Sequence, residues 1–346
     1  MPATSAIRQK LDELVRGWDD IATATPRRYG DLLDEILFHG SARFADYKPC
    51  ESEGPFVFRL HEWLRNVANS LEKQTLLSSL QWLIFVDEQQ MDALYRDAYR
   101  RCLRQWLLSA DINMAELFDS RYELNLRSRL ARVPFMSVTL SFSFPRFTQI
   151  NELLGLPDPL VIGPDSDHAR ASLQGNRQFR DAPECIIFED FVGTGKQASK
   201  ILHVVREMLR PDVRIAFVPL IALEDGVDCL RREHAPLVDV LPVMTIRKEH
   251  CVRPSRSTGE PADFTALRKV VKSTSRRVSL RANDVDDPPA SPFGYGKSGA
   301  LIVTCHNSPN NTLPLIHHRA PSWVPLFRRH HHQQAASRRL YEDGLL

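Results

Sequence analysis

The sequence predicts an α/β protein with a parallel sheet and a helical N-terminal region. Apolar runs of strand length alternate with helical patterns between residues 135 and 246, which is typical of βαβ units. Residues 58–108 instead carry apolar and aromatic residues at helical spacing. The chain has 346 residues, of which 43% are hydrophobic and 25% charged, with a net charge of +2. These values suit a globular protein of one or two domains and argue against a strongly electrostatic nucleic-acid binder.

The first 132 residues are predicted to form a helical region. Helical spacing runs through residues 4–40 and 58–108, on either side of a loop with proline and glycine. Aromatic stripes at this spacing are usually core. We therefore expect a helical N-terminal region over 1–132, an α/β domain over 133–329 and a disordered tail over 330–346.

The α/β domain is predicted from six apolar strands and the helices between them. The helices are expected at 147–154, 196–209 and 225–232, and a further basic helix at 266–277. The strands are expected at 135–144, 160–163, 185–188, 213–222, 238–246 and 300–305. The segment 168–182 is polar, with Arg170, Arg177 and Arg180 and no obvious apolar face. We predict a mobile loop there, either a lid over a bound ligand or an ordinary exposed linker.

The stretch from Cys185 to Ser199 is the strongest candidate for a binding site. An apolar strand runs into Glu189 and Asp190, and the turn Gly193-Thr194-Gly195 then precedes a helix. Carboxylates at the carboxyl end of a parallel strand lie where open α/β sheets bind ligands. Glycines let backbone N–H groups converge on an anion at a helix N-terminus. An acid pair for hydroxyl groups beside a phosphate cradle suits a sugar phosphate.

Two other interpretations of this stretch are weaker. A Walker A loop would need a glycine where Asp190 stands and a serine or threonine where Gln197 stands. A plain glycine turn leaves the acid pair unexplained, because a charged pair at the end of an apolar strand is costly to bury.

This stretch resembles the phosphoribosyl pyrophosphate (PRPP) signature of type I phosphoribosyltransferases. The resemblance implies a phosphoribosyltransferase-like core in which Glu189 and Asp190 hold the ribose hydroxyls and support charge at the ribose. It implies that the 5′-phosphate is held by Gly193, Thr194, Gly195, Lys196 and Gln197. Mg²⁺ would bridge pyrophosphate and diol oxygens, mostly through water. Arg177 and Arg180 would offset the charge of the leaving pyrophosphate.

The chain departs from the family at two positions. Purine-salvage members carry an aspartate, proposed as a general base, where this chain has Gly193. The last phosphate-loop position is usually threonine or serine, and here it is Gln197. The resemblance therefore extends to the ribose-phosphate site and not to the chemistry on a nucleobase.

The segment after the last predicted strand is a second candidate. It reads His306-Asn307-Ser308-Pro309-Asn310-Asn311. If the strand before it runs parallel to 186–188, the side chains that face the same crevice as the acid pair are His306, Asn307, Asn310 and Asn311. His306 is then a candidate proton acceptor in place of Gly193, and the last two asparagines are candidate ligands of the substrate. The alternative is an Asn-Pro loop that fixes its own backbone.

The two motifs together resemble bacterial phosphoribosyltransferase-like proteins of conflict systems, over roughly residues 76–329. That resemblance implies a role in anti-phage defence, beside a retron reverse transcriptase or another defence-system protein, with nucleic acid reached through the partner. Three functions stay open: a phosphoribosyltransferase, a catalytically inactive nucleotide or ribose-phosphate sensor, and a partner-binding subunit. The last would use the basic segment 121–132.

The cysteines and the hydropathy predict a cytoplasmic protein without a membrane segment. The six cysteines are scattered without a C-x-x-C pair, which favours reduced thiols over a disulfide frame or a zinc site. No run of 18 apolar residues occurs, and the first residues lack the apolar core of a signal peptide.

Overall fold

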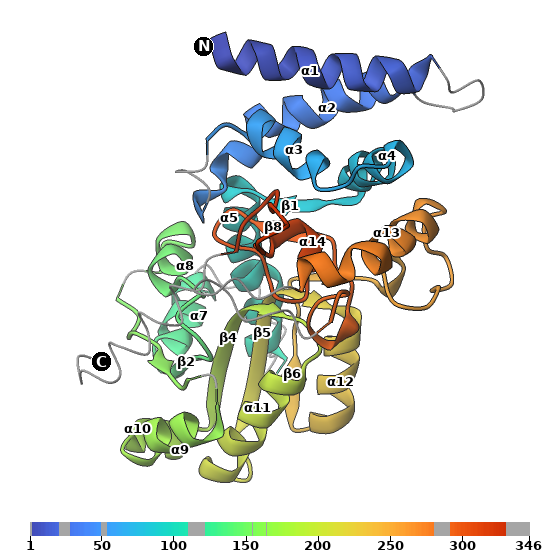
Figure 1. The fold of residues 1–346 in the computed structure, drawn as a ribbon. Coiled ribbons are helices and arrows are strands. Elements are labelled where there is room, and N and C mark those ends of the chain that lie inside the picture. Colours follow the sequence, from blue (N-terminus) through green and yellow to red (C-terminus); the bar gives the residue numbers. More distant parts are fainter. Residues whose placement is uncertain are drawn as a thin grey trace. The chain divides into compact units, whose positions relative to one another are not determined.

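The computed structural model describes residues 2–20, 28–49, 54–109, 122–153, 155–163, 165–279 and 291–329 (Figure 1). These residues fall into two compact units. The sheet unit runs from Gln89 to Arg247, and the helical unit combines the residues before Gln89 with those from Lys248 onward. The helical segments between Gln89 and Leu130 lie in the sheet unit, and the domain boundaries expected at residues 132 and 329 stay a prediction. The predicted tail at 330–346 lies outside the described residues.

The sheet unit contains a parallel sheet, as predicted. Its strands lie in the order β3-β2-β4-β5-β6, and β7 pairs with the far end of β5. Every pairing is parallel. The strands are β2 (Phe135–Ser137), β3 (Leu160–Val161), β4 (Glu184–Val192), β5 (Arg214–Leu223), β6 (Val238–Val240) and β7 (Met244–Ile246).

The two central strands are covered on both faces, which explains their continuous apolar sequences. On one face lie α9 (Ser166–Gln174), α11 (Lys196–Met208) and α12 (Glu224–His234). Ile201, Leu202 and Val205 of α11 are fully buried in this core. Burying each such side chain contributes roughly 2 kcal/mol.

A cluster of phenylalanines extends the core from Phe188 of β4. The ring of Phe142 stacks on that of Phe188 with 4.3 Å between centroids, and Phe147 contacts the same ring. Phe147 belongs to α8 (Phe144–Ile150). Three consecutive helical segments precede the sheet in this unit: α5 (Glu88–Asp97), the π-helix η4 (Ala98–Leu103) and α6 (Arg104–Leu108).

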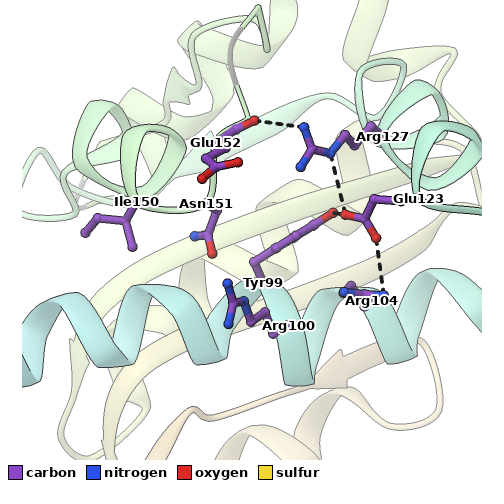
Figure 2. A pocket seen from close by; sticks show the side chains of 8 residues that line it. All are labelled: Tyr99, Arg100, Arg104, Glu123, Arg127, Ile150, Asn151 and Glu152. Atoms are coloured by element: carbon purple, nitrogen blue, oxygen red, sulfur yellow. Dashed lines mark hydrogen bonds and ion pairs between the residues drawn. The ribbon is translucent and has the colours of Figure 1, made fainter.

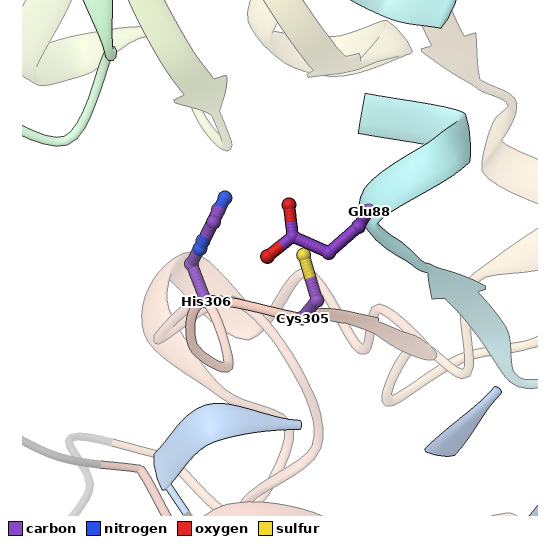
Figure 3. A group of neighbouring side chains, drawn as sticks. All are labelled: Glu88, Cys305 and His306. Atoms are coloured by element: carbon purple, nitrogen blue, oxygen red, sulfur yellow. The ribbon is translucent and has the colours of Figure 1, made fainter. Parts of the chain in front are cut away.

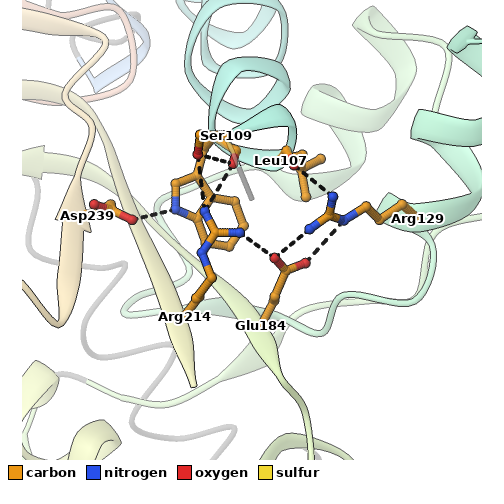
Figure 4. Close-up of polar contacts among 7 residues, drawn as sticks. Leu107, Ser109, Arg129, Glu184, Arg214 and Asp239 are labelled. Atoms are coloured by element: carbon orange, nitrogen blue, oxygen red, sulfur yellow. Dashed lines mark hydrogen bonds and ion pairs between the residues drawn. The ribbon is translucent and has the colours of Figure 1, made fainter. Parts of the chain in front are cut away.

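A polar network holds the amino ends of the strands (Figure 4). Glu184, at the start of β4, forms ion pairs with Arg129 at 2.7 Å and with Arg214 at 2.6 Å. The Arg214 guanidinium lies 4.6 Å from the ring centroid of Trp106, whose Nε1 donates to Asp239 at 2.7 Å. Arg129 comes from α7 (Tyr122–Leu130), so the network ties α6 and α7 to three strands. The basic segment 121–132 is therefore partly structural, and Arg121 lies outside the described residues.

The segment 168–182 is helical, so the prediction of a loop without an apolar face was wrong. It forms α9 and α10 (Arg177–Arg180), and Asp165 caps α9 by accepting from the N–H groups of Asp167 and His168. Ala169 and Leu173, one helical turn apart, are fully buried. An apolar stripe of two residues between arginines is too short to be recognised by periodicity, yet it is enough to pack α9 on α11.

The helical unit is built from helices of both ends of the chain. They are α1 (Pro2–Asp19), α2 (Tyr29–Ala42), α3 (Phe56–Arg65), α4 (Ser70–Ser79), α13 (Asp263–Val278) and α14 (Pro314–His317), with short 3₁₀ turns η1 (Phe44–Asp46), η3 (Leu80–Trp82), η6 (Lys248–His250) and η7 (Tyr295–Lys297). None of the described helices of the chain is both long and apolar enough to cross a bilayer.

The last predicted strand lies in this unit and not in the six-stranded sheet. β8 (Ile302–Thr304) pairs in parallel with β1 (Ile84–Val86) in a separate two-stranded sheet. The expectation that it runs beside residues 186–188 was therefore wrong. Apolarity identifies a strand but not its neighbour, and Ile84-Phe85-Val86 was hidden within a segment of helical pattern.

Candidate functional site

The acid pair lies at the switch point of the sheet. From β2 the chain continues to β3 on one side, and from β4 it continues to β5 on the other. Pairing of β2 with β4 ends at Phe188, whereas pairing of β4 with β5 continues to Val192. Glu189 and Asp190 therefore lie on β4 just beyond the last β2 pair. Doubly wound sheets with this strand order bind ligands at the carboxyl ends of the strands at this point.

Glu189 is buried with one carboxyl oxygen left without a partner among the described residues. The residue is 8% exposed, and its Oε1 lies 3.4 Å from the hydroxyl oxygen of Thr139. Oε2 has no hydrogen-bond partner in the described part of the chain. Burial and the neighbouring charge of Asp190 raise the pKa of Glu189 well above its usual value. Because buried polar atoms are nearly always bonded, Oε2 marks a position for a ligand donor.

Asp190 is half-buried, and the backbone fixes the orientation of its carboxylate. Oδ1 accepts from the N–H of Phe191 at 2.8 Å. Two neighbouring carboxylates, one buried and one partly open, form a site that accepts hydroxyl donors or a hydrated cation.

The glycine turn is fixed by close packing against the start of α12. Gly195 has φ +77°, and a Cβ there would lie 2.8 Å from the carbonyl oxygen of Gly226. A Cβ on Gly226 would lie 2.4 Å from the carbonyl oxygen of Gly193. Both α11 and α12 therefore begin at the edge of the sheet that carries the acid pair.

The turn has the features of an anion cradle. Gly195 is the N-cap of α11 and makes no side-chain cap. The first N–H groups of a helix have no partner within it, and the helix dipole favours an anion there. Thr194 is half-buried, while Lys196 and Gln197 are exposed. Sequence reasoning missed Thr139 and Gly226, although the Asp-Gly step that begins α12 is a signal for close backbone approach.

Arg177 and Arg180 lie on the short helix α10 in the same unit. The side chain of Arg177 is exposed. Their predicted contact with pyrophosphate stays a prediction, now from a helix and not from a loop.

His306 lies in the helical unit, in the group of side chains shown in Figure 3. Ligand atoms of Glu88, Cys305 and His306 lie within 4.8 Å of one another. The ammonium nitrogen of Lys48 is 2.5 Å from Oε1 of Glu88 and 3.4 Å from Nδ1 of His306. Burial raises the pKa of the Cys305 thiol to about 12. The Lys48 ammonium already occupies the position beside Glu88 and His306, which makes the group a poor metal site.

Asn311 ties its loop to the turn at residues 295–298, which precedes β8. It is 4% exposed, and its Nδ2 donates to the carbonyl of Tyr295 at 3.1 Å and to the hydroxyl of Ser298 at 3.0 Å. Asn310 is exposed, and its carbonyl accepts from the N–H of Tyr295 at 2.8 Å. These contacts join both asparagines to the turn at residues 295–298, and the predicted contact of Asn310 and Asn311 with a substrate stays a prediction. His306, Asn310 and Asn311 belong to one unit and the acid pair to the other, so neither unit alone brings them together.

A comparison with protein-family models matches residues 60–329 to the family PRTase-CE. The chain belongs to the PRTase-CE family. The match spans the whole described sheet unit, and it makes this a phosphoribosyltransferase-like protein. A comparison with curated proteins finds no match. The family match is consistent with the resemblance to phosphoribosyltransferases that residues 185–199 suggested.

Proposed function

We propose that this PRTase-CE protein binds PRPP, or a related ribose phosphate, with Mg²⁺ at the switch point of its sheet. The observation that carries the proposal is the buried carboxylate of Glu189, whose Oε2 has no partner among the described residues. It lies on the same strand as Asp190 and ahead of a helix N-terminus that suits a phosphate.

The two carboxylates would accept from the ribose hydroxyls. A hydroxyl that donates to Oε2 of Glu189 satisfies a buried acceptor for which the described residues offer no donor. It also favours the ionised form of Glu189, so binding releases a proton. Thr139 would hold the second oxygen of Glu189, and the Phe191 N–H would hold Asp190.

The glycine turn would hold the 5′-phosphate. Gly193, Thr194 and Gly195 bring backbone N–H groups to the start of α11, and Lys196 and Gln197 stand at its exposed rim. Gly195 has no room for a side chain, because the start of α12 packs against the turn.

The acid pair also fits Mg²⁺. This ion prefers oxygen ligands and keeps several waters, so one or two carboxylates are enough to hold it beside pyrophosphate. When bound, Mg²⁺ would offset the charge of the departing pyrophosphate. The residues of the chain would position the ribose and exclude water from its buried side.

Phosphoribosyl transfer and ligand sensing share the binding step and differ in the chemistry after it. Gly193 cannot accept a proton, which supports a sensor or an enzyme whose acceptor needs no base at this position. The role predicted for His306 requires the helical unit to supply this residue, and it stays a prediction.

A pyrophosphate-release assay together with calorimetry distinguishes phosphoribosyl transfer from ligand sensing. Turnover that Asp190→Asn abolishes indicates an enzyme. PRPP binding without pyrophosphate release, with candidate acceptors present, indicates a sensor.

A role in anti-phage defence is part of the proposal. The resemblance to conflict-system proteins supports it, with a retron reverse transcriptase or another defence-system protein as the partner and nucleic acid reached through that partner. Purification from the native operon tests this: co-purification of a neighbouring gene product is expected. Loss of phage protection on deletion of this gene would be the second result. The expected cytoplasmic location stays a prediction.

A further inference from the structure

A polar cavity of about 250 Å³ lies in the sheet unit and shares no residue with the proposed PRPP site (Figure 2). Its walls come from the π-helix η4, from α6 and α7, and from the end of α8. Three arginines line it, Arg100, Arg104 and Arg127, together with Glu123 and Glu152. Three arginines against two glutamates leave a formal charge of +1, which favours an anion.

Asn151 provides a fixed acceptor in this cavity. Its Nδ2 donates to the carbonyl of Tyr95 at 3.0 Å and to the carbonyl of Phe147 at 2.9 Å. Rotating the amide by half a turn would set Oδ1 against two carbonyl oxygens, so its orientation is determined. Asn151 is 6% exposed, and Oδ1 has no partner among the described residues. A buried acceptor in a cavity indicates that a ligand donor belongs there.

The described residues satisfy the three arginines only in part. Glu123 is shared: it accepts from Arg127 at 3.5 Å, lies 3.3 Å from Arg104 and accepts from the hydroxyl of Tyr99 at 3.2 Å. Burial raises the pKa of Tyr99 to about 12, so this hydroxyl stays protonated. Arg100 forms no hydrogen bond or ion pair with any described residue, and it lines the same cavity as Asn151 and Tyr99 (Figure 2).

The backbone around the cavity departs from regular structure on two sides. The π-helix bonds each N–H to the carbonyl five residues earlier, which brings Tyr99 and Arg104 to one face. Glu152, next to Asn151, has φ +54°, which is uncommon for a residue other than glycine. Its carbonyl accepts from Arg127 at 3.2 Å. Such departures are frequent where a side chain must be aimed at a ligand.

We propose that this cavity binds the phosphate group of a small phosphate ester, with the arginines on its ionised oxygens and a protonated ligand oxygen donating to Oδ1 of Asn151. Guanidinium groups match phosphate oxygens, and a tetrahedral group presents oxygens to several arginines at once. The cavity of about 250 Å³ has room for a phosphate and a small attached group.

Sulfate and phosphate distinguish the role of Asn151. Both are tetrahedral oxyanions, but near about pH 6 phosphate is mainly a protonated monoanion whereas sulfate is a dianion without a proton. Charge alone therefore favours sulfate, and only a hydrogen-bond donor favours phosphate. Calorimetry on the full chain should show inorganic phosphate binding at least about tenfold tighter than sulfate, because sulfate leaves Oδ1 unbonded. Equal affinities for the two anions would overturn the proposal.

Arg100→Gln tests the cavity itself, and Arg96→Gln is its matched control. Arg96 is an exposed arginine on the preceding helix α5 and does not line the cavity. Arg100→Gln should weaken phosphate binding by about tenfold or more while Arg96→Gln leaves it unchanged. The same loss in both variants would show a general charge effect and overturn the assignment.

Two further titrations identify the ligand and separate this site from the first. Tighter binding of ribose 5-phosphate than of AMP assigns a sugar phosphate, and the reverse assigns a nucleotide; failure of both esters to bind overturns the proposal. Lys196→Gln, at the first residue of α11 beside the glycine turn, should leave the Arg100-dependent binding unchanged. Phosphate binding that depends on Arg100 and not on Lys196 would support this proposal even if the chain does not bind PRPP at the switch point.

Discussion

The hydroxyl oxygen of Thr139 lies 3.4 Å from Oε1 of Glu189, across the point where β2 and β4 separate. Thr139 follows β2 by two residues, and its hydroxyl also bonds that of Ser141 at 2.5 Å. The loop after β2 thus holds one oxygen of the buried carboxylate and leaves the other for a ligand. In the proposed function, this contact orients Glu189 so that Oε2 can accept from a ribose hydroxyl.

Glu189→Gln should change how stability depends on pH. The folded protein holds the Glu189 proton to a pH well above the usual pKa of 4.5, because burial disfavours the charge. The stabilisation that the protonated Glu189 carboxyl gives to the folded state is complete below the usual pKa of 4.5. It is lost as the pH rises through the higher pKa of the folded state. Glutamine cannot ionise, so the variant should match the parent near about pH 4 and have a higher Tm near about pH 8.

Thermal unfolding over this pH range measures the effect. The control is Glu207→Gln, at a carboxylate on the exposed surface of α11. A Tm difference between parent and Glu189→Gln that does not vary with pH would contradict the raised pKa.

Gly195→Ala should destabilise the protein by about 2 kcal/mol or more. The left-handed backbone costs a residue with Cβ about 1–2 kcal/mol, and the added atom meets the Gly226 carbonyl at 2.8 Å. Gly226→Ala should have a similar effect and displace the glycine turn. Gly175→Ala is the matched control, since a Cβ there has nothing within 4 Å and its φ of −80° suits alanine. Urea unfolding compares the three, and equal midpoints would refute the packing argument.

Glu184→Ala should cost about 2–3 kcal/mol of folding free energy. It leaves the guanidinium groups of Arg129 and Arg214 without their shared buried carboxylate. Glu207→Ala, which breaks the exposed pair with Arg170, should cost less than about 1 kcal/mol. If chemical denaturation gives the same loss for both, the network of Figure 4 is not a structural anchor.

Cys185 and Cys305 should resist thiol reagents in the folded protein. Both are fully buried, and burial raises the pKa of each thiol to about 12. The thiolate is the reactive form, so at about pH 8 labelling should require unfolding. Peptide mapping after brief exposure to a maleimide tests this. Cys229, which is partly exposed, is the internal comparison and should label first.

The sheet and the acid pair could be predicted from the sequence because local patterns specify them. The alternation of apolar runs with helical patterns indicated the strands. Glu189-Asp190 followed by glycines indicated a candidate binding site at the carboxyl end of a strand. The partner of β8 could not be predicted, because pairing depends on contacts distant in the chain. The helix α9 was missed because only Ala169 and Leu173 form its buried stripe. The arginine cavity had no local signal: its residues come from three separate segments, and only the fold brings them together.

The central claim is that the switch point of the sheet binds PRPP, and calorimetric titration of the full chain with PRPP and Mg²⁺ tests it most directly. We expect the parent to bind and Asp190→Asn to bind at least about tenfold more weakly, because a charged acceptor of the ribose hydroxyls becomes neutral. Asp212→Asn, at an exposed aspartate in the turn before β5, should bind as the parent does. A parent that does not bind PRPP, or an Asp190→Asn variant with unchanged affinity, would contradict the claim.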